Sequence, residues 1–230
     1  MTPPLHAVDG GEPVFRIARQ PDPWEWPDWI RAHADGTFGN RYDDPDGEYR
    51  VLYASSDRIA TFYECLSRFR PDPAVLAAGI TDNDDDAPET STPGLVPADW
   101  CEKRRMGIAR LEGRFCDIGH SDTLLHLRAA LAARVLHYGL DDLDAGDIRK
   151  RAPRRFTQEI SRYVFTTASD DDGQPFAGIR YASRLGDELT NWAIFEPNDP
   201  TDCHDEEIAA DDPDLLAVVE AYGLTIEAQT

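Results

Sequence analysis

The strongest constraint on the fold is the segment from residue 50 to 69, where a strand pattern passes directly into a helix pattern. The run Arg50-Val51-Leu52-Tyr53-Ala54 carries β-favouring side chains between loop signals, which predicts a strand. The apolar side chains that follow recur at helical spacing and predict a helix over 57–69 with one buried face: Ile59, Phe62, Tyr63, Leu66 and Phe69.

The rest of the chain also mixes strand and helix patterns. Strands are expected at 14–18, within 108–116, and at 176–181 and 191–195, and helices at 123–137, 156–165 and 214–222. No regular βαβ spacing connects them, so the chain should form a single α+β domain and not a doubly wound sheet. An acidic, proline-bearing loop is expected at 81–93, and an acidic surface wrap or flexible segment at 196–214.

Charge and composition exclude several classes of function. The formal net charge is −21, which repels phosphate backbones and anionic membranes, so neither nucleic acid nor a membrane is expected as a partner. No apolar run approaches the ~20 residues of a membrane span, and the N-terminal residues lack the pattern of a signal peptide. The four scattered cysteines suggest neither a disulfide framework nor a metal site. We therefore expect a cytoplasmic protein with reduced thiols and no metal.

Local motifs leave the function open. The sequence has no glycine-rich phosphate loop, no HExxH and no GxSxG motif. Glu64 has Arg68 four residues later on the predicted helix, so a surface ion pair is the simplest interpretation. Arg16 lies in an apolar strand, where it needs either a charge partner or an edge position that lets the guanidinium reach solvent.

Three segments together carry more information. They are Val14-Phe15-Arg16-Ile17, then Gly39-Asn40-Arg41-Tyr42 followed by the strand and helix that end at Glu64, and finally Gly178-Ile179-Arg180-Tyr181-Ala182-Ser183 with Trp192-Ala193-Ile194-Phe195. In their order and spacing they resemble the RES-domain family. The resemblance divides the chain into an N-terminal extension (1–12), a RES-like domain (13–197) with a longer, poorly matching middle (71–120), and an acidic C-terminal extension (198–230).

The resemblance implies a fold and an activity. The fold is expected to be similar to ADP-ribosyltransferase toxins, with a split-sheet core and an NAD⁺ cleft. Members of the family degrade NAD⁺ by hydrolysis or phosphorolysis, and many are toxins that an antitoxin protein holds in check. NAD⁺ would then be the substrate, the acceptor water or phosphate, and an antitoxin a possible partner.

The chemistry of NAD⁺ cleavage suits the residues that the resemblance singles out. Glu64 would bond the ribose 2′-hydroxyl and stabilise the positive charge that develops on the sugar. Arg16 and Arg41 would bind the pyrophosphate through paired donors. Tyr53 would stack on nicotinamide or bond the ribose. Ser183 would bond the ribose or orient Glu64, since no base is assigned to make it a nucleophile.

Three alternatives stay open. The same residues would serve an ADP-ribosyltransferase that modifies a macromolecule, because only the acceptor differs. A catalytically degenerate RES scaffold would instead bind a partner protein. A plain α+β domain without this activity would hold Arg16, Glu64 and Ser183 far apart.

Overall fold

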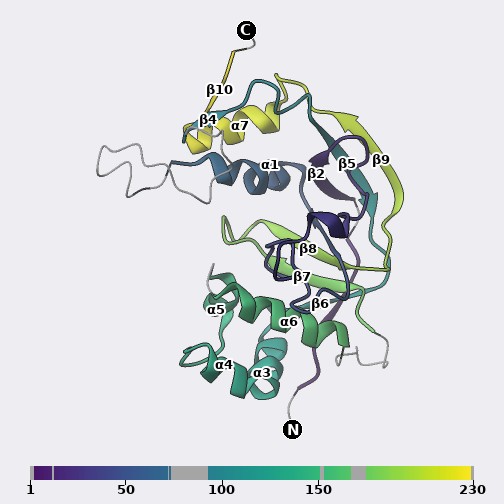
Figure 1. Cartoon of the computed structure of the whole chain (residues 1–230), viewed down its shortest axis with the longest axis vertical. Coiled ribbons are helices and arrows are strands. Elements are labelled where there is room, and N and C mark those ends of the chain that lie inside the picture. Colours follow the sequence, from purple (N-terminus) through teal and green to yellow (C-terminus); the bar gives the residue numbers. More distant parts are fainter. Residues whose placement is uncertain are drawn as a thin grey trace.

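The computed structural model describes residues 3–11, 13–71, 73, 93–150, 153–166 and 175–228. Its centre is an eight-stranded mixed sheet in the order β1-β6-β7-β8-β3-β2-β5-β9 (Figure 1). The strands are β1 (Ala7–Asp9), β2 (Val14–Arg19), β3 (Val51–Ser55), β5 (Arg104–Arg110), β6 (Arg114–Asp117), β7 (Gly178–Ala182), β8 (Thr190–Phe195) and β9 (Thr201–Glu207). The α+β class expected from the sequence is confirmed.

Helices cover the two halves of this sheet separately (Figure 1). One half carries α1 (Arg58–Leu66) and α7 (Pro213–Tyr222), beside a short parallel pair of β4 (Leu95–Val96) and β10 (Thr225–Ile226). The other half carries the remaining helices, namely α3 (Ser121–Ala130), α4 (Ala132–His137), α5 (Ala145–Arg149) and α6 (Arg154–Thr166). Two 3₁₀ turns, η1 (Trp29–Arg31) and η2 (Ser67–Phe69), complete the described elements.

The sheet is split between β2 and β3. These two strands pair at a single position, Phe15 with Ser55. By contrast, β2 follows β5 from Val14 to Arg19, and β3 follows β8 over its whole length. The backbones of β2 and β3 therefore diverge beyond that one pair, which opens the middle of the sheet.

Helix α1 contacts both β2 and β3 beside this opening, and the pattern of its apolar residues sets its orientation. Phe62 and Leu66 are completely buried in the core shared with β5 and α7. Burial of each such side chain contributes about 1.5–3 kcal/mol. Because successive helical residues are about 100° apart, Glu64 projects away from these two residues. The helix predicted over 57–69 is confirmed, with its last turn tightened into η2.

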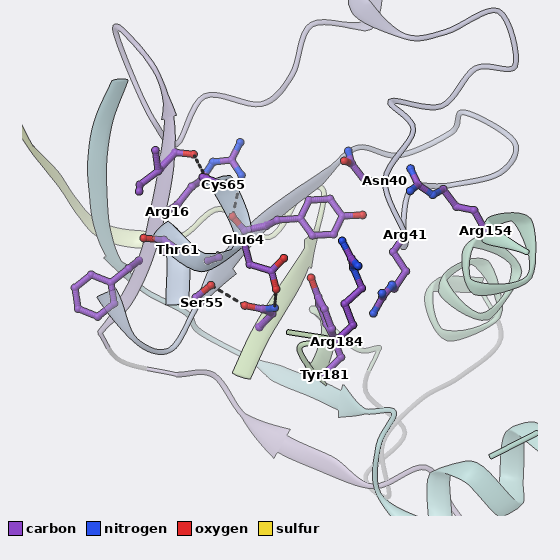
Figure 2. Close-up of a pocket in the computed structure, with 15 residues that line it drawn as sticks. Arg16, Asn40, Arg41, Ser55, Thr61, Glu64, Cys65, Arg154, Tyr181 and Arg184 are labelled. Carbon is purple, nitrogen blue, oxygen red and sulfur yellow. Dashed lines mark hydrogen bonds between the residues drawn. The ribbon is translucent and has the colours of Figure 1, made fainter. Parts of the chain in front are cut away.

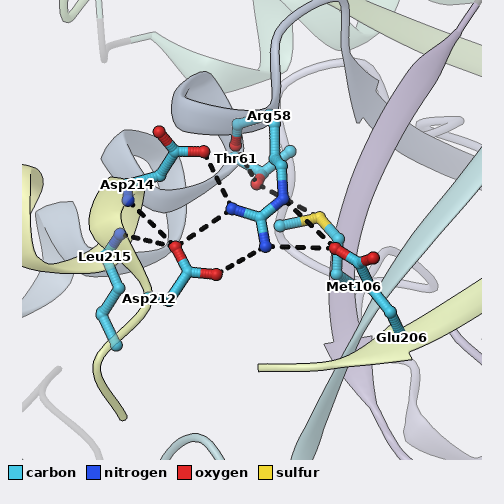
Figure 3. Close-up of polar contacts among 7 residues, drawn as sticks. All are labelled: Arg58, Thr61, Met106, Glu206, Asp212, Asp214 and Leu215. Carbon is cyan, nitrogen blue, oxygen red and sulfur yellow. Dashed lines mark hydrogen bonds and ion pairs between the residues drawn. The ribbon is translucent and has the colours of Figure 1, made fainter. Parts of the chain in front are cut away.

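Arg58 ties α1 to the C-terminal part of the chain (Figure 3). Its guanidinium contacts Asp212 at 2.5 Å and Asp214 at 2.8 Å, both at the start of α7, and Glu206 of β9 at 3.1 Å. Asp212 is only 7% exposed and also accepts the backbone N–H groups of Asp214 and Leu215, so it caps α7. The helix that carries Glu64 is thus anchored from residues beyond position 200.

Several local expectations need correction. The strand expected within 108–116 is two strands, β5 and β6, separated by a turn in which Gly113 has φ 88°. The helix expected over 123–137 is broken at Leu131 into α3 and α4. The acidic segment 196–214 contributes the edge strand β9. The loop expected at 81–93 lies, except for Pro93, outside the described residues.

The acidic C-terminal segment packs on the rest of the chain. Strand β9 pairs with β5, and α7 buries Leu215 and Val218 in the same core as Phe62. The boundary placed at residue 198 stays a prediction. None of the helices in the described part of the chain is both long and apolar enough to cross a membrane.

Candidate active site

A cavity of about 290 Å³ lies where the sheet splits. Strands β2 and β3, helix α1, the start of α6 and the end of β7 all contribute to its wall (Figure 2). Four of the five site residues predicted from the sequence line it: Arg16, Arg41, Tyr53 and Glu64. The fifth, Ser183, is buried behind the wall and hydrogen-bonded to Glu64.

The carboxylate of Glu64 is held by two donors. Ser183 Oγ donates to Glu64 Oε1 at 2.6 Å, and Asn191 Nδ2 donates to the same oxygen at 2.7 Å. Asn191 is itself oriented by Ser55, whose Oγ donates to Asn191 Oδ1 at 2.6 Å. Hydrogen bonds to a charged acceptor are the stronger class, so this chain fixes the carboxylate in one position. Arg68, the ion-pair partner suggested by helical spacing, lines a neighbouring cavity instead.

Ser183 follows directly after β7, and its hydroxyl is engaged on both sides. While Ser183 Oγ donates to Glu64, it accepts the backbone N–H of Leu185 at 3.0 Å. This arrangement suits the orienting role proposed for Ser183 rather than that of a nucleophile, because its proton already points at a carboxylate.

Arg16 lies at the split itself. Its Nε donates to the carbonyl of Pro23 at 2.7 Å, and its Nη1 donates to the carbonyl of Tyr53 at 2.8 Å. The second bond reaches across from β2 to β3, where the two strands no longer pair. Among the described residues these two carbonyls are its hydrogen-bond partners, and burial lowers the pKa of Arg16. A half-buried guanidinium held by neutral oxygens at a cavity wall is well suited to receive an anion.

Tyr53 supports the loop that carries Arg41. Its hydroxyl donates to Asp43 at 3.0 Å and accepts the backbone N–H of Tyr42 at 2.9 Å. Asp43 in turn accepts the backbone N–H of Asn40 at 2.7 Å. Burial raises the pKa of Tyr53 well above its ordinary value, and the nearby charge of Asp43 adds to the shift. The hydroxyl is thus neutral and occupied, which leaves the ring for contact with a ligand.

The cavity is strongly basic within an acidic protein. In the part of the chain that the structure describes, its lining contains four arginines, Arg16, Arg41, Arg154 and Arg184, and one carboxylate, that of Glu64. Arg16 lies on one side of Glu64, and the other three lie on the opposite side (Figure 2). Arg41 is positioned by a 3.2 Å hydrogen bond to a backbone carbonyl and lies 6.0 Å from the centre of the Tyr181 ring. Such an arrangement suits a small ligand with more than one negative charge.

Sequence reasoning missed several of these residues. Arg184 directly follows Ser183, and Asn191 directly precedes the Trp192-Ala193-Ile194-Phe195 segment. Both therefore lie beside segments that carry the family resemblance. Arg154 begins helix α6 and carries no local signal, because only the tertiary fold places it at the cavity. The described residues contain no group of three or more His, Cys, Asp or Glu arranged to hold a metal ion.

Fold and site define a class: a split-sheet α+β domain in which the carboxylate of Glu64 faces a group of arginines in a cavity. The family model of the RES domain matches residues 13–216, and the chain belongs to this family. The match extends through β9 into α7. Among curated proteins, none matches the chain. The RES domain suggests an NAD-related, toxin-like function.

Proposed function

We propose that this protein consumes NAD⁺ by cleaving the bond between nicotinamide and ribose, with water or phosphate as the acceptor. The observation that carries the proposal is the carboxylate of Glu64, oriented by Ser183 and Asn191 inside a cavity that several arginines line. This is the constellation that NAD⁺ cleavage needs, namely one fixed negative charge at the sugar and several cations for the pyrophosphate.

The proposed reaction requires little proton transfer. The C–N bond breaks, and nicotinamide leaves as a neutral base that keeps the bonding electron pair. The ribose ring carries the developing positive charge, and Glu64 stabilises it. Among the described residues both hydrogen bonds to this carboxylate fall on Oε1, which leaves Oε2 for the substrate. An oxygen of water or phosphate then forms the new bond to the sugar carbon, and water releases its proton to solvent.

The remaining site residues bind and orient the substrate in this proposal. Arg16 and Arg41 take the pyrophosphate, with Arg154 and Arg184 as further cations. The ring of Tyr53 stacks on nicotinamide, since its hydroxyl is occupied by Asp43. Fixed charges aimed at the developing charge typically lower the barrier by about 3–4 kcal/mol per key group.

The decisive experiment follows NAD⁺ consumption by purified protein with and without phosphate. Glu64→Gln should lower turnover by roughly 10²–10³-fold, because it removes the charge that stabilises the ribose cation. Glu220→Gln is the matched control, since Glu220 is exposed on α7. Unchanged turnover in Glu64→Gln would overturn the proposal. Phosphate dependence would identify phosphorolysis, and radiolabel on a macromolecule would identify ADP-ribosyl transfer instead.

A toxin role belongs to the same proposal. Sustained loss of NAD⁺ would slow growth of a cell that makes the protein in its cytoplasm, and an antitoxin chain would relieve the effect. Expression of the wild type should therefore slow growth, while Glu64→Gln at equal protein level should not. Equal growth inhibition by both would point to binding of a partner protein, the role of a degenerate scaffold.

A further inference from the structure

A second cavity of about 440 Å³ adjoins the first. The two share the wall formed by Arg16, Ile17 and Cys65. Arg16 lies at the junction, because one of its hydrogen bonds reaches Pro23 beside the second cavity and the other reaches Tyr53 in the first. The two cavities therefore meet at this side chain.

The second cavity is also rich in arginine. Its lining includes Arg16, Arg19, Arg31, Arg68 and Arg104, together with three acidic residues of the 22–28 loop. Two of these acids, Asp22 and Asp28, accept backbone N–H groups of their own loop at 2.8 and 3.0 Å. Their carboxylates are thus used in part to shape the loop.

Three of these arginines come from different elements. Arg19 belongs to β2, Arg68 to η2 and Arg104 to β5. Burial lowers the pKa of Arg104, and the positive charges of Arg19 and Arg68 act in the same direction. The three acidic residues offset part of the charge of the five arginines, so the lining residues that the structure describes keep a positive excess. This excess suits a ligand with concentrated negative charge.

We propose that the second cavity binds the adenosine half of the dinucleotide through a phosphate monoester on its ribose, so that the preferred substrate is the 2′-phosphorylated form, NADP⁺. The inference rests on the proposed function and deepens it. A pyrophosphate at Arg16 and Arg41 carries one charge per phosphate, whereas a monoester carries ~1.5–2 near neutral pH. Arginine is the residue that accommodates a 2′-phosphate in dinucleotide sites. The half-buried ring of Trp26 lines the same cavity and offers a surface for adenine.

Binding without turnover tests this site. Isothermal titration calorimetry should show adenosine 2′,5′-bisphosphate binding at least tenfold more tightly than 5′-AMP. The double variant Arg19→Ala/Arg68→Ala should abolish that difference, and both side chains are exposed, so the fold should tolerate their loss. Arg128→Ala is the control, since this exposed arginine of α3 pairs with Asp142 on the other half of the molecule.

Each outcome has a defined meaning. Equal affinities of the two nucleotides for the wild type would overturn the site, as would full displacement of the bisphosphate by an equal concentration of inorganic phosphate. A tenfold preference that survives in the double variant would also overturn it. If the preference holds while neither NAD⁺ nor NADP⁺ is consumed, the site stands and the proposed function fails. If NAD⁺ is consumed but the preference is missing, the proposed function stands and the second site fails.

Discussion

Asp212 offers the sharpest test of how the fold positions the helix that carries Glu64. Its carboxylate performs two tasks. It caps α7 by accepting the backbone N–H groups of Asp214 at 3.0 Å and Leu215 at 3.2 Å, and it pairs with Arg58 of α1. Asn at this position would keep the cap and lose the ion pair, whereas Ala would lose both. The two substitutions therefore separate the contributions.

The magnitudes follow from burial. Loss of a helix cap costs about 1 kcal/mol. Breaking a buried ion pair costs about 3–5 kcal/mol, but Arg58 is 26% exposed and keeps Asp214 and Glu206. We therefore expect Asp212→Asn to lower the free energy of unfolding by about 1–2 kcal/mol and Asp212→Ala by about 2–3 kcal/mol. For a domain of this size, the melting temperature should fall by roughly 2–4 °C per kcal/mol.

Urea unfolding, followed by circular dichroism, measures these differences. Glu206→Gln serves as the control, because the side chain of Glu206 is 46% exposed and its pair with Arg58 should contribute less than about 1 kcal/mol. Equal losses in the Asn and Ala variants would refute the capping role. If both variants unfolded with the same free energy as the wild type, the anchoring of α1 to α7 would be refuted.

The same residue predicts a dependence on pH. Burial raises the pKa of Asp212, but the hydrogen bonds from Arg58 and from the backbone of Leu215 outweigh it, so the pKa lies below its usual value. A depressed pKa in the folded state contributes stability that is present above the unfolded value of about 3.9 and is lost as the pH falls further. The wild type should therefore lose more stability than Asp212→Asn between about pH 5 and pH 3.

Three further substitutions probe the site and the sheet. Ser183→Ala removes one of the two hydrogen bonds to Glu64 and should lower the proposed NAD⁺ turnover by roughly 10–100-fold in a steady-state assay. Because it also leaves the backbone N–H of Leu185 without this acceptor, the free energy of unfolding should fall by about 1–3 kcal/mol. Tyr53→Phe leaves the buried carboxylate of Asp43 without one donor and should cost about 1–3 kcal/mol in urea unfolding; an unchanged midpoint would count against this support of the loop. Gly178→Ala would place a Cβ 2.1 Å from the carbonyl oxygen of Ala193 and should lower the melting temperature more than Tyr53→Phe does.

Sequence could predict elements whose stability comes from their own pattern. The strand at Arg50-Val51-Leu52-Tyr53-Ala54 and the helix that follows are determined by residues a few positions apart, and both were found nearly where expected. The same holds for α6 and α7, whose apolar residues repeat at helical spacing. Glu64 could be placed on its helix, although helical spacing alone suggested Arg68 as its partner.

Elements that depend on a distant partner could not be predicted. Strand β9 is exposed along nearly its whole length and lacks apolar alternation. It forms because β5 offers both an edge and basic side chains. Arg105 pairs with Asp205, and Arg110 pairs with Asp202 at 3.2 Å. Such cross-strand pairs stabilise a sheet only where register brings them together, so an acidic segment read alone resembles a loop.

The start of α3 shows the same limit at short range. The sequence His120-Ser121-Asp122 offers two favoured capping residues, yet Nδ1 of His120 accepts the backbone N–H of Asp122 at 3.2 Å. The His120 ring stacks on His6, with ring centres 3.7 Å apart. Since His6 lies on the segment leading into β1, the residue that caps this helix also makes a contact far away in sequence.

The distribution of charge connects the fold with the proposed chemistry. A chain with a net charge of −21 places four arginines around one cavity and five around its neighbour, with Arg16 common to both. The acidic exterior disfavours long polyanions, whose many phosphates would meet it, whereas a dinucleotide is small enough to place all its phosphates inside the cavities. The split between β2 and β3 makes this possible, because Arg16 can occupy the middle of a sheet only where the strands stop pairing and leave a carbonyl for it to bind. The divergence of β2 and β3 therefore both opens the sheet and places the guanidinium of Arg16 at the junction of the two cavities.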